Sequence, residues 1–411
     1  MSSATGVDVT SVARVAALLS RRPQAAQRVY TESERRDCAG QPQRWATRWA
    51  AKEAVRKLHG AAGLPLPAFH DVEVVVGARG APSLRVHGVA SDLRLSLAHE
   101  GDLAVAVVTG EPAPASYAEV PLGLQLAARP EDAHKGTFGT VVVVGGAVGF
   151  SGAPLLSATA AARGGAGRVR VCVPSAIYPL VAAQTLEVMA NPLPDADGGI
   201  APEALAVLRE RHFPGASTLV LGPGLGRAPL TERFVVDLLH ELPAPTVVDA
   251  DGLNIAAARG VDWRSCNQPV VLTPHPAEMG RLCSLTTSAV QQRRRELAAS
   301  FAHHSGAVVV LKGSDTVVAA PDGRVHVSAL RVVALASGGS GDVLSGLLGA
   351  LIAQGLEPFD AAVAAVFVHA EAALALQHRR GRAGVLPRDV IDELPAAQER
   401  VRRVLEHRRA R

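Results

Sequence analysis

Beyond residue 121, short apolar runs rich in β-branched residues alternate with stretches of helical character, and this alternation constrains the fold more than any other feature. The runs lie at residues 140–144, 168–173, 218–221, 246–249, 270–273 and 307–311. Helical stretches separate them, for example residues 153–163, 231–241 and 291–304. Continuously apolar strands between helices are typical of a largely parallel sheet covered on both faces. The sequence therefore predicts an α/β domain whose ligands bind beyond the carboxyl ends of its strands.

The part of the chain before residue 111 has a different order of elements. Helical segments extend to residue 59, and strand-like runs follow at residues 71–76, 83–87, 93–97 and 103–108. This order predicts an α+β domain of about 110 residues. Residues 111–121, EPAPASYAEVP, are rich in Pro and Ala and are typical of a linker. We therefore predict domains at residues 1–112 and 121–400, joined by a linker at residues 113–120.

Bulk composition excludes several classes of protein. The net charge of +4 over 411 residues gives no case for nucleic-acid binding. None of the four cysteines forms a CxxC pair, so no zinc site is indicated. We see no secretory signal and no apolar run near the roughly 20 residues that span a membrane. We therefore expect a cytoplasmic protein that binds neither nucleic acid nor membranes.

Glycine-rich segments and a histidine follow three of the predicted strands. GGAVGFSG (residues 145–152) and GPGLG (residues 222–226) match neither a P-loop nor a dinucleotide-binding fingerprint. Each is either a tight turn or a loop whose backbone approaches a ligand closely. His275 stands between two prolines in TPHPAE, where it is either a ligand hydrogen-bonding group or a partly exposed loop histidine.

The strongest signal lies further along the chain. KGSDT (residues 312–316) follows a strand, and SGGSGD (residues 337–342) opens the predicted helix at residues 343–353. Small residues at a helix N-terminus expose several N–H groups, which form an anion hole aided by the helix dipole. Asp342 in that hole is a candidate base for a substrate hydroxyl. The alternative is that Asp342 only caps the helix.

Eight motifs in order resemble one family. They are HKGTFG (residues 134–139), GGAVGFSGA, GPGLG, VVDADGLN (residues 247–254), LTPHPAEM, VLKGSDTV, SGGSGDVLSG and PRDVIDELP (residues 387–395). They resemble the ADP-dependent NAD(P)H-hydrate dehydratases, which have a ribokinase-like fold. The resemblance covers residues 122–395. It implies that ADP or ATP drives the loss of water from (S)-NADHX or (S)-NADPHX, through phosphorylation of the ring hydroxyl and departure of phosphate.

The same resemblance implies roles for single residues. The implied catalytic residue is Asp342. The implied substrate contacts are Ala153, Gly224, His275 and Asp342. The implied nucleotide contacts are Lys312, Gly313, Ser314, Asp315, Thr316 and Gly341. Residues 328–334, SALRVVA, depart from the Asn-rich, Gly-Asn-Pro-like stretch that usually precedes the anion hole in this family.

The first domain carries two acids that are far apart in sequence. Asp8 lies on a short apolar run, and Glu53 is the single acid of the helix-forming stretch RWAAKEAVRK at residues 48–57. Each acid alone is more typical of a solvated surface carboxylate. Together, however, two acids can share a Mg²⁺ ion that also binds pyrophosphate oxygens.

The surrounding segments resemble holo-[acyl-carrier-protein] synthase, a 4'-phosphopantetheinyl transferase, over residues 6–110. They are VDVTSVARV, RWATRWAAKEAVRKLHG, DVEVVVGARGAPSLRVHG and LRLSLAHEGDLAVAVV. The resemblance implies transfer of 4'-phosphopantetheine from coenzyme A to a serine of an acyl carrier protein. It implies Asp8 and Glu53 as Mg²⁺ ligands, Lys52 and His99 as coenzyme A contacts, and Arg14 as a carrier-protein contact. Thr10, Ser11 and the loop at residues 60–67 depart from the family pattern.

Three interpretations follow. In the first, the chain is a two-headed enzyme that also forms a homo-oligomer. In the second, one domain is a non-catalytic scaffold, which the altered segments at residues 10–11 and 328–334 favour. In the third, the second domain is a ribokinase-like small-molecule kinase, since a fold does not fix a function; the HKG, HPAE and KGSDT motifs together argue against it.

Overall fold

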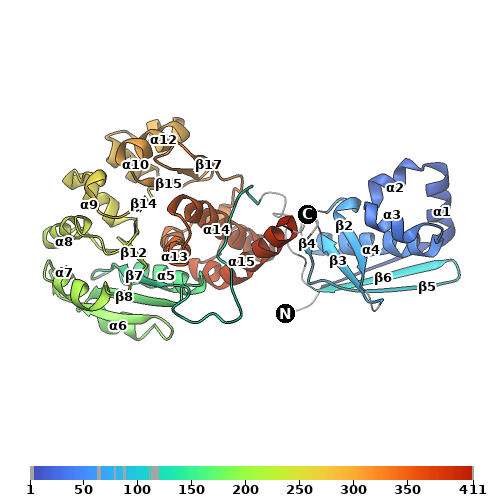
Figure 1. Cartoon of the computed structure of the whole chain (residues 1–411), viewed down its shortest axis with the longest axis horizontal. Helices are drawn as coiled ribbons and strands as arrows, with labels where there is room; N and C mark the ends of the chain where they lie inside the picture. The colour runs from blue at the N-terminus through green and yellow to red at the C-terminus, as the bar shows by residue number, and fades with distance from the viewer. Residues whose placement is uncertain are drawn as a thin grey trace. The chain divides into compact units, whose positions relative to one another are not determined.

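The computed structural model describes residues 4–62, 66–77, 80–86, 89–110, 112 and 120–409. By its internal contacts the chain divides into two compact units (Figure 1). Residues up to Val120 form most of the first unit, and Pro121–Gln377 with Arg382–Glu399 form the second. Apart from Val120, the predicted linker at residues 113–120 lies outside the described residues.

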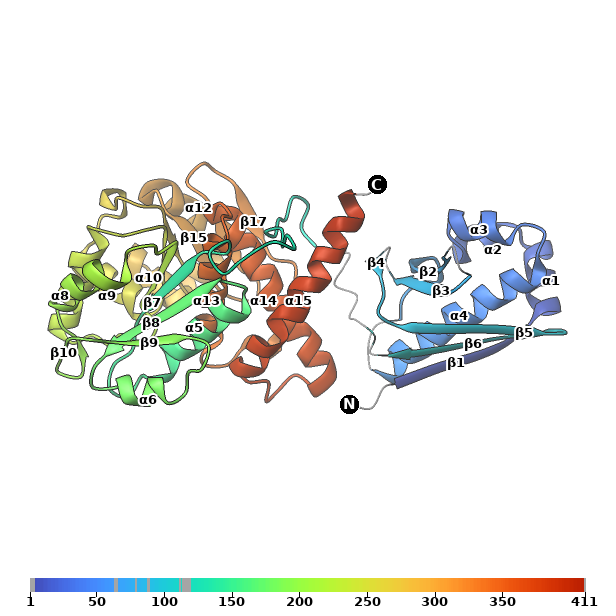
Figure 2. The same cartoon turned by 60° about the horizontal axis from the view of Figure 1, so that its bottom comes forward.

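The first unit has the predicted α+β class. Its described elements are β1 (Ala4–Ser11), α1 (Val12–Arg21), α2 (Gln24–Val29), α3 (Glu32–Cys38), α4 (Pro42–Ala61), β2 (Val72–Val76), β3 (Pro82–Val86), β4 (Val89–Ala90), β5 (Arg94–Glu100) and β6 (Leu103–Gly110). The strands form two antiparallel sheets, β1-β6-β5 and β2-β3-β4. Figure 2 shows β1, β6 and β5 running side by side along α4.

Small residues let β1 lie directly against α4. A Cβ on Gly6 would come within 2.0 Å of the Ala54 carbonyl oxygen, so only glycine permits this approach. Ala50, Ala54 and Leu58 of α4 are fully buried in the same core as Val108 of β6. The contact places Asp8 of β1 next to the helix that carries Glu53.

The second unit is built on a nine-stranded sheet with the order β17-β16-β15-β14-β13-β12-β7-β8-β9. The seven strands from β9 to β15 in this order are parallel, and β16 and β17 are antiparallel. Its strands are β7 (Thr140–Val144), β8 (Arg168–Pro174), β9 (Met189–Leu193), β12 (Thr218–Leu221), β13 (Thr246–Val248), β14 (Val270–Leu272), β15 (Val308–Leu311), β16 (Val317–Ala319) and β17 (Val325–Val327). The short pair β10 (Asp195–Ala196) and β11 (Gly199–Ile200) forms a separate ribbon. The predicted α/β class with a mostly parallel sheet is confirmed.

Helices cover both faces of this sheet (Figure 1). They are α5 (Gly152–Arg163), α6 (Tyr178–Ala182), α7 (Ala204–Val207), α8 (Pro229–Leu239), α9 (Asp251–Arg259), α10 (Pro276–Cys283), α11 (Thr287–Gln292), α12 (Arg294–Ser305), α13 (Ser340–Ala353), α14 (Pro358–Arg380) and α15 (Pro387–Arg409). Val142 and Leu219 pack in one core with Phe234 of α8. On the other face, Gly349 of α13 lies against Val220 and Val141. The successive side chains of each strand point alternately into these two cores, so both sets are apolar. This explains the continuous Val and Leu runs of the strands.

Two expectations about the helices were wrong. The helix predicted at residues 291–304 is divided between α11 and α12. In addition, α14 is long and apolar enough to cross a membrane by length and composition, with a mean hydropathy of 1.7 over its most apolar window, whereas no such run was expected. Because 89% of that window is buried inside the structure, α14 has the surroundings of a core helix.

Candidate functional site

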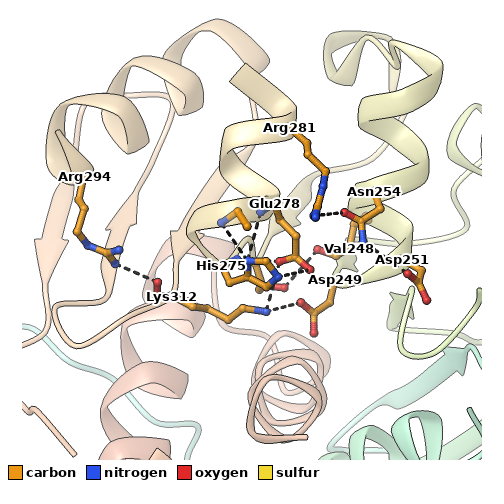
Figure 3. Close-up of polar contacts among 11 residues, drawn as sticks. Val248, Asp249, Asp251, Asn254, His275, Glu278, Arg281, Arg294 and Lys312 are labelled. Carbon is orange, nitrogen blue, oxygen red and sulfur yellow. Dashed lines mark hydrogen bonds and ion pairs between the residues drawn. The ribbon is translucent and has the colours of Figure 1, made fainter. Parts of the chain in front are cut away.

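Polar side chains converge where three neighbouring parallel strands end. Asp249 directly follows β13, His275 and Glu278 follow β14, and Lys312 follows β15. Asp342 lies in the first turn of α13 and interacts electrostatically with the same cluster. Figure 3 shows His275, Glu278 and Lys312 grouped with Asp249 at this edge. The sheet therefore brings Asp342, His275 and Lys312 of the predicted site into one place, as expected for carboxyl ends of parallel strands.

An ion pair lies at the centre of the cluster. The Lys312 Nζ atom is 2.7 Å from Asp249 Oδ1 and 4.0 Å from Glu278 Oε2. Burial alone lowers the pKa of Lys312, but Asp249 and Glu278 outweigh it, so the net shift is upward. Lys312 is therefore a fixed cation. Neither acid was predicted as a site residue, although Asp249 ends a predicted strand and Glu278 stands three residues after His275.

Two carboxyl groups in the cluster titrate near neutrality. Burial raises the pKa of Asp342 to about 7; Asp249 raises it further, and Lys312 opposes the rise. Burial also raises the pKa of Glu278 to about 7, with Lys312 lowering it and Asp249 raising it. A base with such a pKa accepts a proton well at physiological pH. No side-chain hydrogen bond caps the N-terminus of α13, which argues against Asp342 as a helix cap.

His275 is held as a neutral hydrogen-bond donor. Its Nδ1 atom accepts the N–H groups of Ala277 (3.1 Å) and Glu278 (3.2 Å), which fixes the ring proton on Nε2. Burial, together with Lys312 and Arg281, lowers the pKa of His275. The ring is nearly half exposed, and its Nε2 atom lies 3.3 Å from Glu278 Oε1. His275 is therefore suited to donate to a carbonyl or hydroxyl of a ligand, and not to accept a proton.

The two glycine-rich loops lie against each other. The Gly146 N–H donates to the Pro223 carbonyl (2.8 Å). Gly224 has a φ of +64°, and a Cβ there would lie 3.1 Å from the Ala153 Cβ. The structure thus brings Ala153 and Gly224, two predicted substrate contacts, side by side.

The N-terminus of α13 has the form of the predicted anion hole. Gly339, the N-cap residue directly before α13, has a φ of +91°, which is strained for residues other than glycine. A Cβ on Gly341 would lie 3.1 Å from Lys312 Nζ. The first N–H groups of a helix have no partner within it. Here they lie beside a lysine ammonium, so an anionic group bound there would meet both.

The predicted nucleotide loop closes on itself through Thr316. Its hydroxyl accepts the Gly313 N–H (3.3 Å) and donates to the Gly313 carbonyl (2.9 Å). Arg294 of α12, which was not predicted from the sequence, holds the loop in place. Its Nη2 atom donates to the carbonyls of Leu311 (2.8 Å), Lys312 (3.1 Å) and Asp315 (3.1 Å).

The segment that departs from the family pattern contacts the same loop. Arg331 Nε lies 2.7 Å from Asp315 Oδ1, and both side chains are solvent-accessible. Residues 328–334 therefore supply a cation beside Asp315, next to Ser314 in the loop.

In the first unit, Asp8 and Glu53 come from elements that pack together. Asp8 Oδ1 accepts from Lys57 Nζ (2.7 Å), and Lys57 lies one helical turn after Glu53 on α4. Among the described residues, no group of three or more His, Cys, Asp or Glu side chains is placed to hold a metal ion. Mg²⁺ is commonly held by one or two carboxylates with water and substrate phosphate oxygens. The two acids therefore fit Mg²⁺ only as part of a complex with a phosphate-containing ligand.

Lys52 was wrongly expected to contact coenzyme A. Its side chain is fully buried, its Nζ atom pairs with Glu34 Oε2 at 2.8 Å, and it donates to the carbonyls of Phe69 and Val72. The ammonium thus has a structural role and no exposed face. Glu34 is just as buried, and it also accepts the Val74 N–H (2.9 Å), so the pair joins α3 and α4 to β2.

The other predicted contacts of the first unit lie on its surface. Arg14 on α1 and His99 on β5 are exposed. Arg14 Nη2 donates to Thr10 Oγ1 (3.0 Å), and the strand pairing places Thr10 and His99 on either side of Ala104. The altered Ser11 caps α1 by accepting the Arg14 N–H (3.1 Å). Arg14 and His99 therefore lie at the same end of one sheet, and their contacts with the carrier protein and coenzyme A stay predictions.

Comparison with known proteins supports both resemblances. A family model described as NAD(P)H-hydrate dehydratase matches residues 141–396, and one described as 4'-phosphopantetheinyl transferase superfamily matches residues 4–108. The ADP-dependent (S)-NAD(P)H-hydrate dehydratase of Neisseria meningitidis serogroup B is 40% identical over 277 residues, which cover 66% of this chain and 88% of the relative.

Longer relatives and a solved structure agree. The bifunctional NAD(P)H-hydrate repair enzyme Nnr of Moorella thermoacetica is 40% identical over 272 residues, 66% of this chain and 51% of the relative. The chain thus spans about half the length of such bifunctional relatives. The crystal structure of the ADP/ATP-dependent NAD(P)H-hydrate dehydratase from Bacillus subtilis, co-crystallized with ATP/Mg²⁺, superposes with a TM-score of 0.58 at 28% identity and covers 67% of this chain and 94% of that one. Through its second unit, this chain belongs to the NAD(P)H-hydrate dehydratase family.

Proposed function

We propose that the second unit dehydrates (S)-NADHX and (S)-NADPHX to NADH and NADPH with ADP as the phosphoryl donor. The observation that carries this proposal is the position of Asp342. It is a largely buried carboxyl with a pKa of about 7, at a helix N-terminus that also meets the Lys312 ammonium. The relatives named for this activity cover the same part of the chain.

The arrangement suits phosphoryl transfer followed by elimination. Asp342 takes the proton of the ring hydroxyl. The hydroxyl oxygen attacks the terminal phosphorus of ADP, and the bond from that phosphorus to AMP breaks. The N–H groups of α13 and Lys312 stabilise the charge of the group in transfer. The bond between the ring carbon and the phosphorylated oxygen then breaks, and phosphate leaves. Loss of a proton from the neighbouring ring carbon restores the C=C bond.

The test is an assay of the purified full chain with hydrated cofactor and ADP, ATP or no nucleotide. We expect the absorbance of the reduced nicotinamide ring to return only with the (S) epimer and a nucleotide, with one AMP formed per NADH when ADP is used. The small-molecule kinase interpretation predicts instead that a phosphorylated product accumulates and no NADH is recovered. That result would replace the dehydratase proposal.

We predict that the dehydration rate rises with pH through neutrality. The raised pKa of Asp342, about 7, means that its carboxyl is mostly protonated below neutral pH and cannot accept the hydroxyl proton. The value of kcat/KM should therefore be about tenfold lower at about pH 6 than on the plateau above about pH 8. A rate profile measured at saturating ADP checks this. A flat profile down to about pH 5 would contradict a base with this pKa.

Replacing Arg294 by alanine should weaken nucleotide binding more than catalysis. The guanidinium holds three carbonyls of the 311–315 segment in place. Loss of one hydrogen bond to a charged group costs about 1.5–3 kcal/mol, so we expect KM for ADP to rise about tenfold or more. The exposed neighbour Arg295 on the same helix provides the control, as Arg295→Ala should leave KM unchanged. An Arg294→Ala enzyme with normal KM would show that the loop keeps its shape unaided.

We also propose that the first unit transfers 4'-phosphopantetheine from coenzyme A to a serine of an acyl carrier protein. The match of residues 4–108 to the 4'-phosphopantetheinyl transferase superfamily favours this function. Asp8 and Glu53 would hold Mg²⁺ there, which would neutralise the pyrophosphate charge. The exposed Arg14 would meet the acidic carrier protein, and His99 would contact coenzyme A.

A further inference from the structure

We propose that Asp249 is a positioning residue of the dehydration site, which holds the Lys312 ammonium at the N-terminus of α13 for the phosphoryl group in transfer. This inference rests on the proposed function. It concerns a residue to which neither the motifs nor the comparisons gave a role.

The geometry of the Asp249–Lys312 pair fixes the position of the ammonium. Asp249 is 1% exposed, and its Oδ1 atom lies 2.7 Å from Lys312 Nζ. A Cβ on Gly341 would lie 3.9 Å from Asp249 Oδ2 and 3.1 Å from Lys312 Nζ. Both charged groups therefore face the same first turn of α13. Without Asp249, the flexible lysine chain would have other positions open to it.

The backbone that carries Asp249 is strained and closely packed. The next residue, Ala250, has φ +49° and ψ −118°, a conformation that is costly for any residue except glycine. The backbone of Asp249 is also packed closely against Gly222, since a Cβ on Gly222 would lie 1.8 Å from the Asp249 carbonyl oxygen. On the far side, the Asp251 Oδ2 atom accepts the Gly226 N–H (2.9 Å). Strain of this kind persists where surrounding structure enforces it, and it clusters at functional sites.

Stability alone does not explain the Asp249–Lys312 pair. A buried ion pair contributes little net stability compared with apolar residues of the same volume. This pair also lies at the ligand-binding edge of the sheet and not in either core. Its cation remains partly accessible, with 19% of the Lys312 side chain exposed. The position of the pair therefore suits binding of an anion better than stabilisation of the core.

A consequence for the base follows from the charges around it. Four charged groups act on Asp342: Asp249 after β13, Asp251 on α9, Glu278 on α10 and Lys312 after β15. After burial, Asp249 is the largest cause of the raised pKa of Asp342. Neutralising Asp249 should therefore lower the pKa of the base as well as release Lys312.

The experiment compares Asp249→Asn with the wild-type full chain. We expect kcat to fall about 10- to 100-fold, because a misplaced catalytic group costs rate in this range. The pH at which kcat/KM reaches half its plateau should also move to lower values. Asp251→Asn is the matched control, since that acid lies in the same turn but bonds Gly226 and not Lys312. It should retain more of kcat than Asp249→Asn.

A double variant separates positioning from a structural role. If Asp249 acts through Lys312, the double variant Asp249→Asn/Lys312→Met should be no slower than Lys312→Met alone, because effects along one pathway are not additive. The double variant also removes both charges of the Asp249–Lys312 pair together, so it keeps the test valid if the single variant does not fold. Additive losses, or an Asp249→Asn enzyme with unchanged kcat and pH profile, would overturn the role of Asp249. A wild-type chain that recovers no NADH would instead overturn the proposed function itself.

Discussion

Replacing Asp342 by asparagine should lower nucleotide-driven recovery of NADH from NADHX by about 10²–10⁴-fold, the usual contribution of a positioned general base. The substitution keeps the size and shape of the side chain but removes its ability to accept the hydroxyl proton. The anion hole, which is made by the backbone of α13 and by Lys312, stays in place. We therefore expect the loss in kcat and not in the affinity for ADP.

The same substitution should not weaken the fold. Because burial raises the pKa of Asp342 to about 7, the folded state disfavours the ionised carboxylate relative to the unfolded chain. The native state then binds more protons than the unfolded state between the two pKa values, so this group makes stability fall as pH rises toward 7. Above neutral pH, the Asp342→Asn protein should unfold at the same temperature as the wild type or a higher one.

Calorimetry and steady-state kinetics on the two proteins check both halves of this prediction. Lost activity with retained stability is typical of a catalytic residue that does not stabilise the fold. Near wild-type turnover by Asp342→Asn would remove Asp342 from the role of base. Lost activity with a large fall in melting temperature would show that its main contribution is structural.

The strands were the most predictable part of the molecule. The runs expected at residues 140–144 and 218–221 coincide with β7 and β12. These strands are buried on both faces, so their apolar character is continuous and local in the sequence. The glycine run before α13 was equally visible, because an anion hole is made by successive residues of one chain segment.

Features that depend on distant residues could not be predicted in this way. Asp249 and Lys312 are 63 residues apart, and only the order of the strands brings them together. Lys52 lies in a recognisable motif, yet its pairing with Glu34 from another helix removes it from the surface. The roles of Asp249 and Lys52 are therefore set by partners that no local pattern identifies.

Removing either Asp8 or Glu53 should reduce phosphopantetheine transfer by at least about 100-fold and leave NADHX repair unchanged. Metal stabilisation of a phosphoryl group is worth several kcal/mol. Because only two carboxylates would bind the metal, loss of either one should remove most of this stabilisation. Asp8→Asn and Glu53→Gln would each be tested by the mass gain of an acidic carrier protein incubated with coenzyme A and Mg²⁺. Glu32→Gln is the matched control, since Glu32 is an exposed acid of the same unit.

A shared metal makes a sharper prediction than two independent acids. Both single variants should require more Mg²⁺ for the transfer that remains, and the double variant should be little worse than either, because each change disables the same ion. Lys57 Nζ pairs with Asp8 Oδ1 at 2.7 Å and competes with a metal ion for this carboxylate. Lys57→Ala should therefore tighten Mg²⁺ binding measured by calorimetry with coenzyme A present. Transfer that persists in both single variants would rule out the shared ion. A wild-type chain that modifies no acidic carrier protein, while it still repairs NADHX, would make the first unit a scaffold.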